Sequence, residues 1–376
     1  MVIPAGALDD LLAAITGAGY EVLGPTVRGG AIVIGTLTAA DQLPRGWGDA
    51  QDGGTYRIVE RGDGAYFGFA APAGTWKRHL FPPRTVLWRS RRDGDGVVFE
   101  EVEQPVRRRA FLGIRGCDLS AIAVQDRVFV HGRYGDPTYA ARRQDLLLVG
   151  VDCGDPASTC FCTSMGTGPA AGDGADLVLT ELDPANPDRH RFLVRPLSER
   201  GSAIADRLRS TAADDTDLEG ATAVTHRAAD RMHRRMNTDG LPQLLAASPN
   251  HPRWDDVAAR CLSCGNCTMA CPTCFCSNVS DEPDVAAGVD ERVREWASCF
   301  QLGHSYLHGG SLRVSTKSRY RQWMTHKLST WWDQFGVSGC VGCGRCIAWC
   351  PVGIDITEEV RAIRARPGAV APMEGG

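Results

Sequence analysis

The sequence of 376 residues has no cysteine before Cys117 and only three lysines among its 41 basic residues. No stretch approaches about 18 uninterrupted apolar residues, which excludes a transmembrane helix. The N-terminus also lacks the basic start and long apolar core of a signal peptide. Because the formal net charge is -4, no basic excess is available to hold a polyphosphate. We therefore expect a cytoplasmic chain with neither nucleic acid nor a membrane as partner.

The sequence also lacks a P-loop, an HExxH motif and the motif of a catalytic triad. What it has in excess is cysteine, with 15 residues, eight of them in two short runs near the C-terminus. The chain is too large to need a disulfide scaffold, and an odd number of cysteines cannot pair completely within one chain. The composition therefore favours reduced cysteines that bind metal.

The first 110 residues read as one short helix followed by strands. Residues 8–16 form an amphipathic pattern that Gly17 ends. From about residue 31 to 110, the runs AIVIGTL, TYRIVE, AYFGFA, RTVLWR and VVFEEVE are rich in β-forming residues and separated by Gly, Asp and Pro. This region is expected to be mostly antiparallel sheet.

A different pattern begins at residue 110. The apolar strand AFLGI is followed by the helix DLSAIAVQDRVF, with Asp118 as the expected N-cap, and then by the strand DLLLVGVDC. A strand, a helix and a strand predict a parallel crossover, so Cys117 and Cys153 would both lie just past the carboxyl ends of neighbouring strands. Strands at 176–182 and 191–197 would complete the sheet, and helices would connect 198–250.

The two cysteine runs share the spacing C-x2-C-x2-C-x3-C-P, which is the run of bacterial ferredoxins. Three cysteines at this spacing can bind three irons of one cubane, and Gly265 and Gly344 would let the backbone turn closely around it. In two-cluster ferredoxins the fourth cysteine binds the other cluster. Two crossed [4Fe–4S] clusters are therefore expected. Cluster 1 would bind Cys261, Cys264, Cys267 and Cys350, and cluster 2 would bind Cys340, Cys343, Cys346 and Cys271.

Zinc is the alternative for these runs, but zinc ribbons use pairs of CxxC separated by a longer gap. The insert at 272–339 contains two segments with helical period, ERVREWASCFQLGHSYL and SRYRQWMTHKLSTWWDQFG. Their aromatic residues would either surround the clusters or belong to an ordinary core. These residues are Trp296, Phe300, Trp323, Trp331 and Phe335.

The expected fold class is α+β, with an N-terminal mixed α/β domain followed by an α-helical dicluster ferredoxin domain. The boundaries place the first domain at 1–250, the second at 251–365, and a disordered tail at 366–376. Four cysteines of the first domain form a candidate third site, for an iron–sulfur cluster or a zinc ion: Cys117, Cys153, Cys160 and Cys162. They could equally be buried, reduced thiols. The roles of Cys274, Cys276 and Cys299 stay open.

The chain resembles the iron–sulfur β subunit of cytoplasmic NAD(P)-linked [NiFe]-hydrogenases, also called sulfhydrogenases, and the similar A subunit of anaerobic sulfite reductase. The resemblance spans nearly the whole chain. Beside both ferredoxin runs, it rests on YEVLGP (20–25), GGAIV (29–33), WKRHLFPPR (76–84), RGCDLSAI (115–122) and CFCTSMGTGP (160–169).

This resemblance implies a non-catalytic electron-transfer subunit. Its expected partners are a flavin subunit that binds NAD(P)H, an iron–sulfur small subunit and a [NiFe] large subunit. Two alternatives stay open at this point. The chain could be the relay subunit of an anaerobic sulfite reductase, or it could be a structural or regulatory metal-binding protein.

Overall fold

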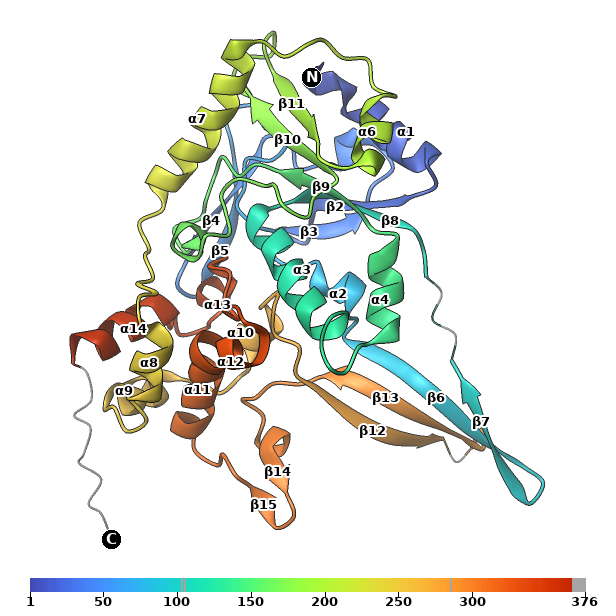
Figure 1. The fold of residues 1–376 in the computed structure, drawn as a ribbon, viewed down its shortest axis with the longest axis vertical. Helices are drawn as coiled ribbons and strands as arrows, with labels where there is room; N and C mark the ends of the chain where they lie inside the picture. The colour runs from blue at the N-terminus through green and yellow to red at the C-terminus, as the bar shows by residue number, and fades with distance from the viewer. Residues whose placement is uncertain (103, 105, 285, 367–376) are drawn as a thin grey trace.

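The computed structural model describes residues 1–102, 104, 106–284 and 286–366, so the tail expected to be disordered lies outside the described residues except for Arg366. Its main sheet has seven strands in the order β1-β11-β10-β9-β8-β2-β3 (Figure 1). The strands are β1 (Val2–Pro4), β2 (Glu21–Arg28), β3 (Ala31–Thr36), β8 (Arg109–Ile114), β9 (Leu147–Val151), β10 (Leu177–Leu182) and β11 (Arg191–Pro196).

The four central strands of this sheet are parallel. β8 pairs with β9 on one side and with β2 on the other, and β9 pairs with β10. The outer strands β1, β3 and β11 join in antiparallel fashion. The parallel crossover expected between residues 110 and 153 is therefore confirmed.

Helices cover both faces of the main sheet. α1 (Leu8–Gly17) and α6 (Glu199–Ala205) lie on one face, where Leu11 packs in one core with Leu112 of β8. α3 (Gly116–Phe129) and α4 (Pro137–Gln144) lie on the other, where Ile122 packs in a second core with Phe111. Neighbouring residues of one strand thus point to opposite cores, as a sheet buried on both faces requires. The remaining elements of this part are η1 (Ala5–Ala7), η2 (Ala40–Gln42), α2 (Lys77–Leu80), α5 (Cys162–Met165) and α7 (Asp215–Arg231).

The strand expected at AYFGFA is wrong. β4 (Trp47–Asp52) and β5 (Thr55–Glu60) form a hairpin, but residues 65–70 are irregular and buried. Their backbone groups are satisfied by side chains: Glu181 accepts from the N–H groups of Tyr66 and Phe67, at 2.7 and 2.9 Å. The buried guanidinium of Arg115 donates to the carbonyls of Phe67, Phe69 and Ala70. Long-range polar partners, invisible to local periodicity, replace a neighbouring strand here.

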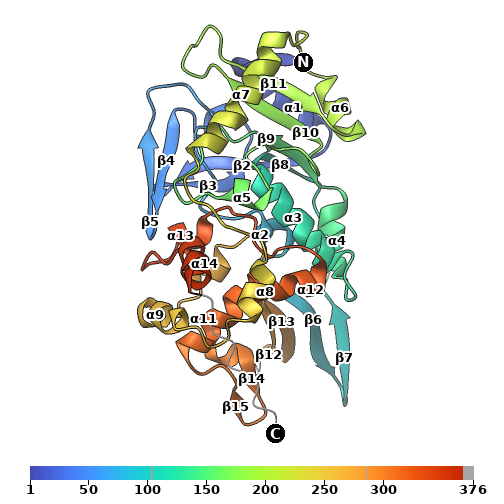
Figure 2. The same ribbon diagram turned by 60° about the vertical axis from the view of Figure 1, so that its left-hand side comes forward.

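A second sheet projects from the body of the protein (Figure 2). It is antiparallel, in the order β12 (Ser277–Asp284), β13 (Val289–Trp296), β6 (Arg84–Asp93) and β7 (Gly96–Glu101). The helix expected for ERVREWASCFQLGHSYL is therefore wrong. Its first residues lie in β13, and η3 (Leu302–Ser305), β14 (Tyr306–Leu307) and β15 (Gly310–Ser311) follow. Val293 of β13 is fully buried opposite Val86 of β6, a partner more than 200 residues away that the local pattern does not reveal.

The part around the cysteine runs therefore contains strands as well as helices, and its strands share a sheet with residues 84–101. The helical expectation for SRYRQWMTHKLSTWWDQFG is confirmed, with a π-helical segment in the middle. The elements are α8 (Leu241–Ala246), α9 (Arg253–Arg260), α10 (Asn266–Met269), α11 (Thr316–Thr325), η4 (His326–Thr330), α12 (Trp331–Phe335), α13 (Arg345–Ala348) and α14 (Ile356–Ala365). No helix in the described part of the chain is long and apolar enough to cross a membrane.

Candidate metal centres

The cysteines expected to share cluster 1 surround one small, largely apolar cavity. Cys261 follows the end of α9, and Cys267 lies in the short helix α10. Cys350 comes from the second run, nearly 90 residues later, yet it lines the same cavity. The cysteines of this cavity are Cys261, Cys264, Cys267, Cys346 and Cys350, and its aromatic walls are Phe300, Tyr320 and Trp323. The structure therefore brings together the four residues that the crossed arrangement requires, with Cys346 at the border toward the other group.

The two runs repeat the same local geometry. Gly265 and Gly344 both have positive φ, +78° and +73°, and each precedes a short helix that carries the third cysteine. A side chain at Gly344 would come within 2.4 Å of the carbonyl oxygen of Thr159, so the close approach requires glycine. The backbone N–H two residues after the first cysteine also donates to its sulfur in both runs, over 3.4 Å to Cys261 and 3.4 Å to Cys340.

The cysteines expected to share cluster 2 lie deeper in the protein. Cys340 and Cys271 are buried, whereas Cys264 of the first group is exposed. Burial raises the pKa of Cys346 well above its usual value, and the neighbouring Cys340, Cys343 and Cys271 raise it further. This mutual influence places Cys271 of the first run among three cysteines of the second. Such a group binds metal only with deprotonated thiols, so loading releases protons and lets the metal charge offset the buried thiolates.

The four N-terminal cysteines also gather in one place. Cys153 follows β9, Cys117 lies in the first turn of α3, and Cys160 and Cys162 flank the start of α5. All four are buried. Burial, followed by Cys153 and then Cys343, raises the pKa of Cys162 to about 12. Two members of the third cysteine group thus follow the carboxyl ends of β8 and β9, and the other two lie at the start of α5.

This third group is pressed against the second run. The N–H of Phe161 donates to the carbonyl of Gly342 at 2.9 Å, and Thr167 Oγ1 donates to the carbonyl of Val341 at 2.6 Å. The sulfur of Cys160 lies 3.9 Å from the carbonyl oxygen of Cys343. Segments about 180 residues apart in the sequence therefore form one continuous cysteine-rich interior.

Asp118 contributes to this contact in a way that differs from expectation. The N-cap of α3 is Arg115, not Asp118, and Asp118 lies inside the first turn. Its carboxylate accepts two hydrogen bonds from Arg345, between Cys343 and Cys346, and both side chains are almost completely buried. The carboxylate of Asp118 therefore pairs with the second cysteine run and does not cap the helix.

Within the described residues, no three Cys, His, Asp or Glu side chains are grouped tightly enough to hold a single metal ion. A tetrahedral zinc site draws its sulfurs to about 2.3 Å from one ion. Each cysteine of a cubane instead binds a different iron, so its thiols stand around a larger volume. The all-cysteine donor sets of the two runs fit iron–sulfur clusters, and the donor set of the third group fits an iron–sulfur cluster or a zinc ion.

The three remaining cysteines form contacts of a different kind. The neighbouring Cys299 and then His304 lower the pKa of Cys276 to about 4, against the effect of burial. Cys274 contacts Cys271.

Of the expected aromatic shell, Phe300 and Trp323 line the first cavity together with Tyr320, which the sequence pattern does not single out. Trp331 and Phe335 pack on Phe275 instead.

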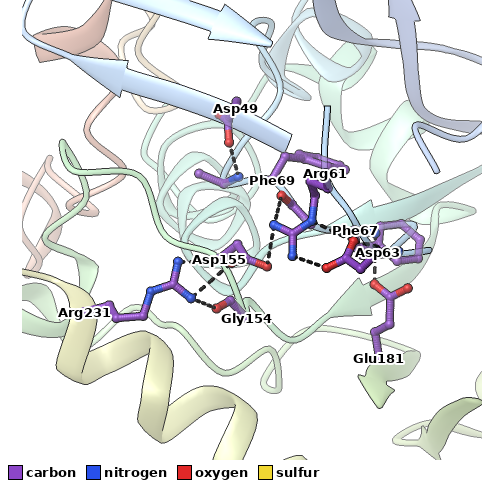
Figure 3. A network of polar contacts seen from close by, with 12 residues as sticks. Asp49, Arg61, Asp63, Phe67, Phe69, Gly154, Asp155, Glu181 and Arg231 are labelled. Carbon is purple, nitrogen blue, oxygen red and sulfur yellow. Dashed lines mark hydrogen bonds and ion pairs between the residues drawn. The ribbon is translucent and has the colours of Figure 1, made fainter. Parts of the chain in front are cut away.

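A polar cavity of about 360 Å³ opens at the carboxyl edge of β9 and β10. Figure 3 shows the network of polar contacts at this edge. Its charges are largely paired with one another. Arg61 donates to Asp63 at 2.9 and 2.6 Å and lies 3.3 Å from Asp155, which also accepts from Arg231. These contacts connect Asp155, two residues after Cys153, to the β4–β5 region. The network therefore stabilises the loop that carries the third cysteine group.

The structure also buries two lysines that the sequence patterns do not single out. Lys77 and Lys327 are 4% and 3% exposed, although lysine is almost never buried without a partner. The only signal in the sequence is the position of Lys327 between aromatic and apolar residues of a helical segment. Burial lowers the pKa of Lys77. Burial acts in the same direction on Lys327, but Cys271 and Cys274 outweigh it and raise its pKa well above the usual value.

Comparison with known proteins agrees with this geometry. Residues 260–354 match the model of a 4Fe-4S dicluster domain. The chain is also 32% identical over 294 residues to the protein named sulfhydrogenase 2 subunit beta of Pyrococcus furiosus, across 76% of this chain and 84% of that one. The chain belongs to the sulfhydrogenase beta-subunit family. No solved structure matches it. Membership of this family and the dicluster domain make the chain an iron–sulfur electron-transfer subunit of hydrogenase type.

Proposed function

We propose that the chain relays single electrons between a flavin subunit that binds NAD(P)H and a [NiFe]-hydrogenase module of small and large subunits. The name of the Pyrococcus relative supports a hydrogenase assembly. A relay subunit needs metal ligands but no general acid, base or nucleophile of its own. This requirement agrees with a chain whose chemistry is concentrated in cysteines.

The proposed ligands follow the crossed arrangement. Cluster 1 is held by Cys261, Cys264, Cys267 and Cys350, and cluster 2 by Cys340, Cys343, Cys346 and Cys271. We propose an iron–sulfur cluster rather than zinc at the third group, Cys117, Cys153, Cys160 and Cys162. When bound, each cluster accepts and returns one electron. The residues of this chain bind the irons, exclude water through the apolar walls, and set the local charge.

The observation that carries the proposal is the contact between the three groups. Cys346 lines the cavity of the first group, and Cys160 touches the backbone of Cys343 in the second. One end of this series reaches solvent, because Cys264 is exposed, and the other end is buried in the N-terminal part. A structural metal site needs no such continuity, whereas electron transfer depends on it.

Metal analysis of the anaerobically purified chain, with EPR during dithionite reduction, tests the ligand assignment. About twelve irons per chain support three clusters, and about eight support the dicluster part alone. Eight irons with one zinc would make the third group structural. Zinc without iron would contradict the relay and leave a structural or regulatory metal-binding protein.

The partners are tested by purifying the tagged chain from its own host under anaerobic conditions. Nickel and flavin that co-purify in a fixed ratio to the chain support the hydrogenase assembly. Sirohaem in place of nickel would support the sulfite reductase alternative instead. A chain that carries its clusters but purifies without flavin, nickel or sirohaem would contradict both assemblies.

A further inference from the structure

We propose that Lys327 raises the reduction potential of cluster 2 through its contact with the sulfur of Cys271. This inference rests on the proposed function, and in particular on Cys271 being a ligand of cluster 2. It concerns how this chain sets the potential of one of the two clusters of the dicluster domain.

The ammonium group of Lys327 makes all its hydrogen bonds to Cys271 and to groups beside it. Its Nζ lies 3.2 Å from the sulfur of Cys271, 3.2 Å from Thr273 Oγ1 and 2.9 Å from the carbonyl oxygen of Gly339. An ammonium group has three protons, so these three acceptors use its whole donor capacity. Gly339 directly precedes Cys340, so the same side chain contacts the backbone beside one ligand of the group and the sulfur of another.

The equivalent position in the other run has no such cation among the described residues. Cys350 is the fourth cysteine of the second run, as Cys271 is of the first, and its sulfur accepts from the backbone N–H of Ile354 at 3.3 Å. The residue after the shared proline differs as well. It is Thr273 in the first run, with its hydroxyl 3.1 Å from the sulfur of Cys271, and Val352 in the second. The sulfur of the fourth cysteine therefore accepts from an ammonium group in the first run and from a backbone N–H in the second.

The direction of the effect follows from charge. Reduction adds one negative charge to a site that already holds four thiolates, and burial makes that addition unfavourable. The group around Cys271 is the more buried of the two. A buried ammonium in contact with a ligand sulfur stabilises the reduced form by charge and by hydrogen bonding, both of which act strongly where water is excluded. Lys327 therefore raises the reduction potential of cluster 2.

The chain contains its own controls, because it has only three lysines. Lys77 is also buried, but its Nζ donates to the carbonyl of Cys274 at 2.8 Å and lies over the ring of Trp296 at 3.9 Å, not against a ligand sulfur. Lys317 is at the surface, where it pairs with Asp255 at 2.8 Å. The three lysines thus differ in their distance from Cys271 while sharing one chemistry.

An EPR-monitored redox titration of the full chain with its clusters tests the inference. Lys327→Met removes the charge and keeps most of the length of the side chain. We expect the midpoint potential of cluster 2, identified as the signal altered by Cys340→Ser, to shift to a more negative value. Lys77→Met should shift it less, and Lys317→Met should leave both midpoints in place. Lys327→Arg, which keeps the charge, should restore most of the wild-type value.

An unchanged midpoint of cluster 2 in Lys327→Met, or an equal shift of both clusters, would overturn the inference. If Lys327→Met loads too little iron to titrate, Lys327→Gln, which also removes the charge, provides the decision. It should give a negative shift that Lys327→Arg does not give, and equal midpoints of cluster 2 in Lys327→Gln and Lys327→Arg would count against the inference. A wild-type chain without two reversible clusters would instead refute the proposed function itself.

Discussion

Arg345 and Asp118 form a buried, doubly hydrogen-bonded ion pair, with 2.8 and 2.9 Å between the two guanidinium nitrogens and the two carboxylate oxygens. Arg345 stands between two cysteines of the second run, and Asp118 follows Cys117 directly. One pair of charges therefore joins the loop of the second cysteine run to the strand-end cysteines of the main sheet. Their side chains are only 2% and 1% exposed, so neither charge can be hydrated if the other is removed.

Arg345→Met is expected to destabilise the protein by about 3–5 kcal/mol, because it leaves the carboxylate of Asp118 buried without its partner. Denaturant unfolding under anaerobic conditions measures this loss. The double variant Asp118→Leu/Arg345→Met removes both charges and should recover most of the stability. Lys317→Ala, which breaks the exposed pair with Asp255, is the matched control and should cost less than about 1 kcal/mol. A double variant no more stable than the single one would contradict this account.

Cys350→Ser is expected to perturb the cluster proposed at Cys261, Cys264 and Cys267, although Cys350 belongs to the other run. The reason is its position on the wall of the first cavity. EPR of the reduced protein separates the signals of the two clusters. The reciprocal variant, Cys271→Ser, should affect the signal of the cluster proposed at Cys340, Cys343 and Cys346. If each serine perturbs the cluster of its own run, the crossed assignment is wrong.

The double variant Cys160→Ser/Cys162→Ser is expected to lower the iron content by about four per chain while both dicluster signals remain. These thiols lie in the third group, and the dicluster ligands are all outside it. Cys299→Ser changes a cysteine outside the three groups and should leave the iron content unchanged. Equal iron in the double variant and the wild type would show that the third group holds no cluster.

His79 is expected to make stability depend on pH. Burial, followed by Arg109 and Arg78, lowers its pKa to about 4, and its Nε2 has no hydrogen-bond partner among the described residues. The folded state therefore keeps the ring neutral where the unfolded chain, near pKa 6.5, binds a proton. Stability is full above about pH 6.5 and is lost as the pH falls toward 4, by about 1 kcal/mol at pH 5.5.

The measurement is the denaturant midpoint at pH 7.5 and pH 5.5. The wild type should lose more stability between these two values than His79→Met, which cannot titrate at this position. The same loss in both proteins would assign the pH dependence to other groups.

Much of the main sheet can be predicted because its signal is local. AFLGI and DLLLVGVDC are apolar runs of strand length joined by a helical segment, and their parallel pairing follows from the crossover. The signal of the cysteine runs is equally local, and their repeated spacing alone predicts that Cys350 joins the first group. The strand-end argument likewise predicts that Cys117 and Cys153 lie near each other, and they share one group with Cys160 and Cys162.

The errors share a different cause. Val293 is buried only because β6, more than 200 residues earlier, pairs with β13, and residues 65–70 avoid a strand only because Arg115 and Glu181 satisfy their backbone. Asp118 has the residue type of an N-cap but pairs with Arg345 instead. Lys327 carries no motif, and its proximity to Cys271 appears only in three dimensions. Each error thus depends on a partner distant in sequence.

The antiparallel pairing of β6 with β13 has a consequence for biosynthesis. Residues 84–101 leave the ribosome long before residues 277–296, so β6 has only β7 beside it while most of the chain is being made. An isolated two-stranded hairpin is marginally stable at best. The edge of β6 is completed only after the first cysteine run has been translated, and the second run comes later still. The β6–β7 hairpin is therefore completed before the metal-binding loops, and a nascent chain truncated before residue 277 exposes an unpaired strand edge prone to aggregation.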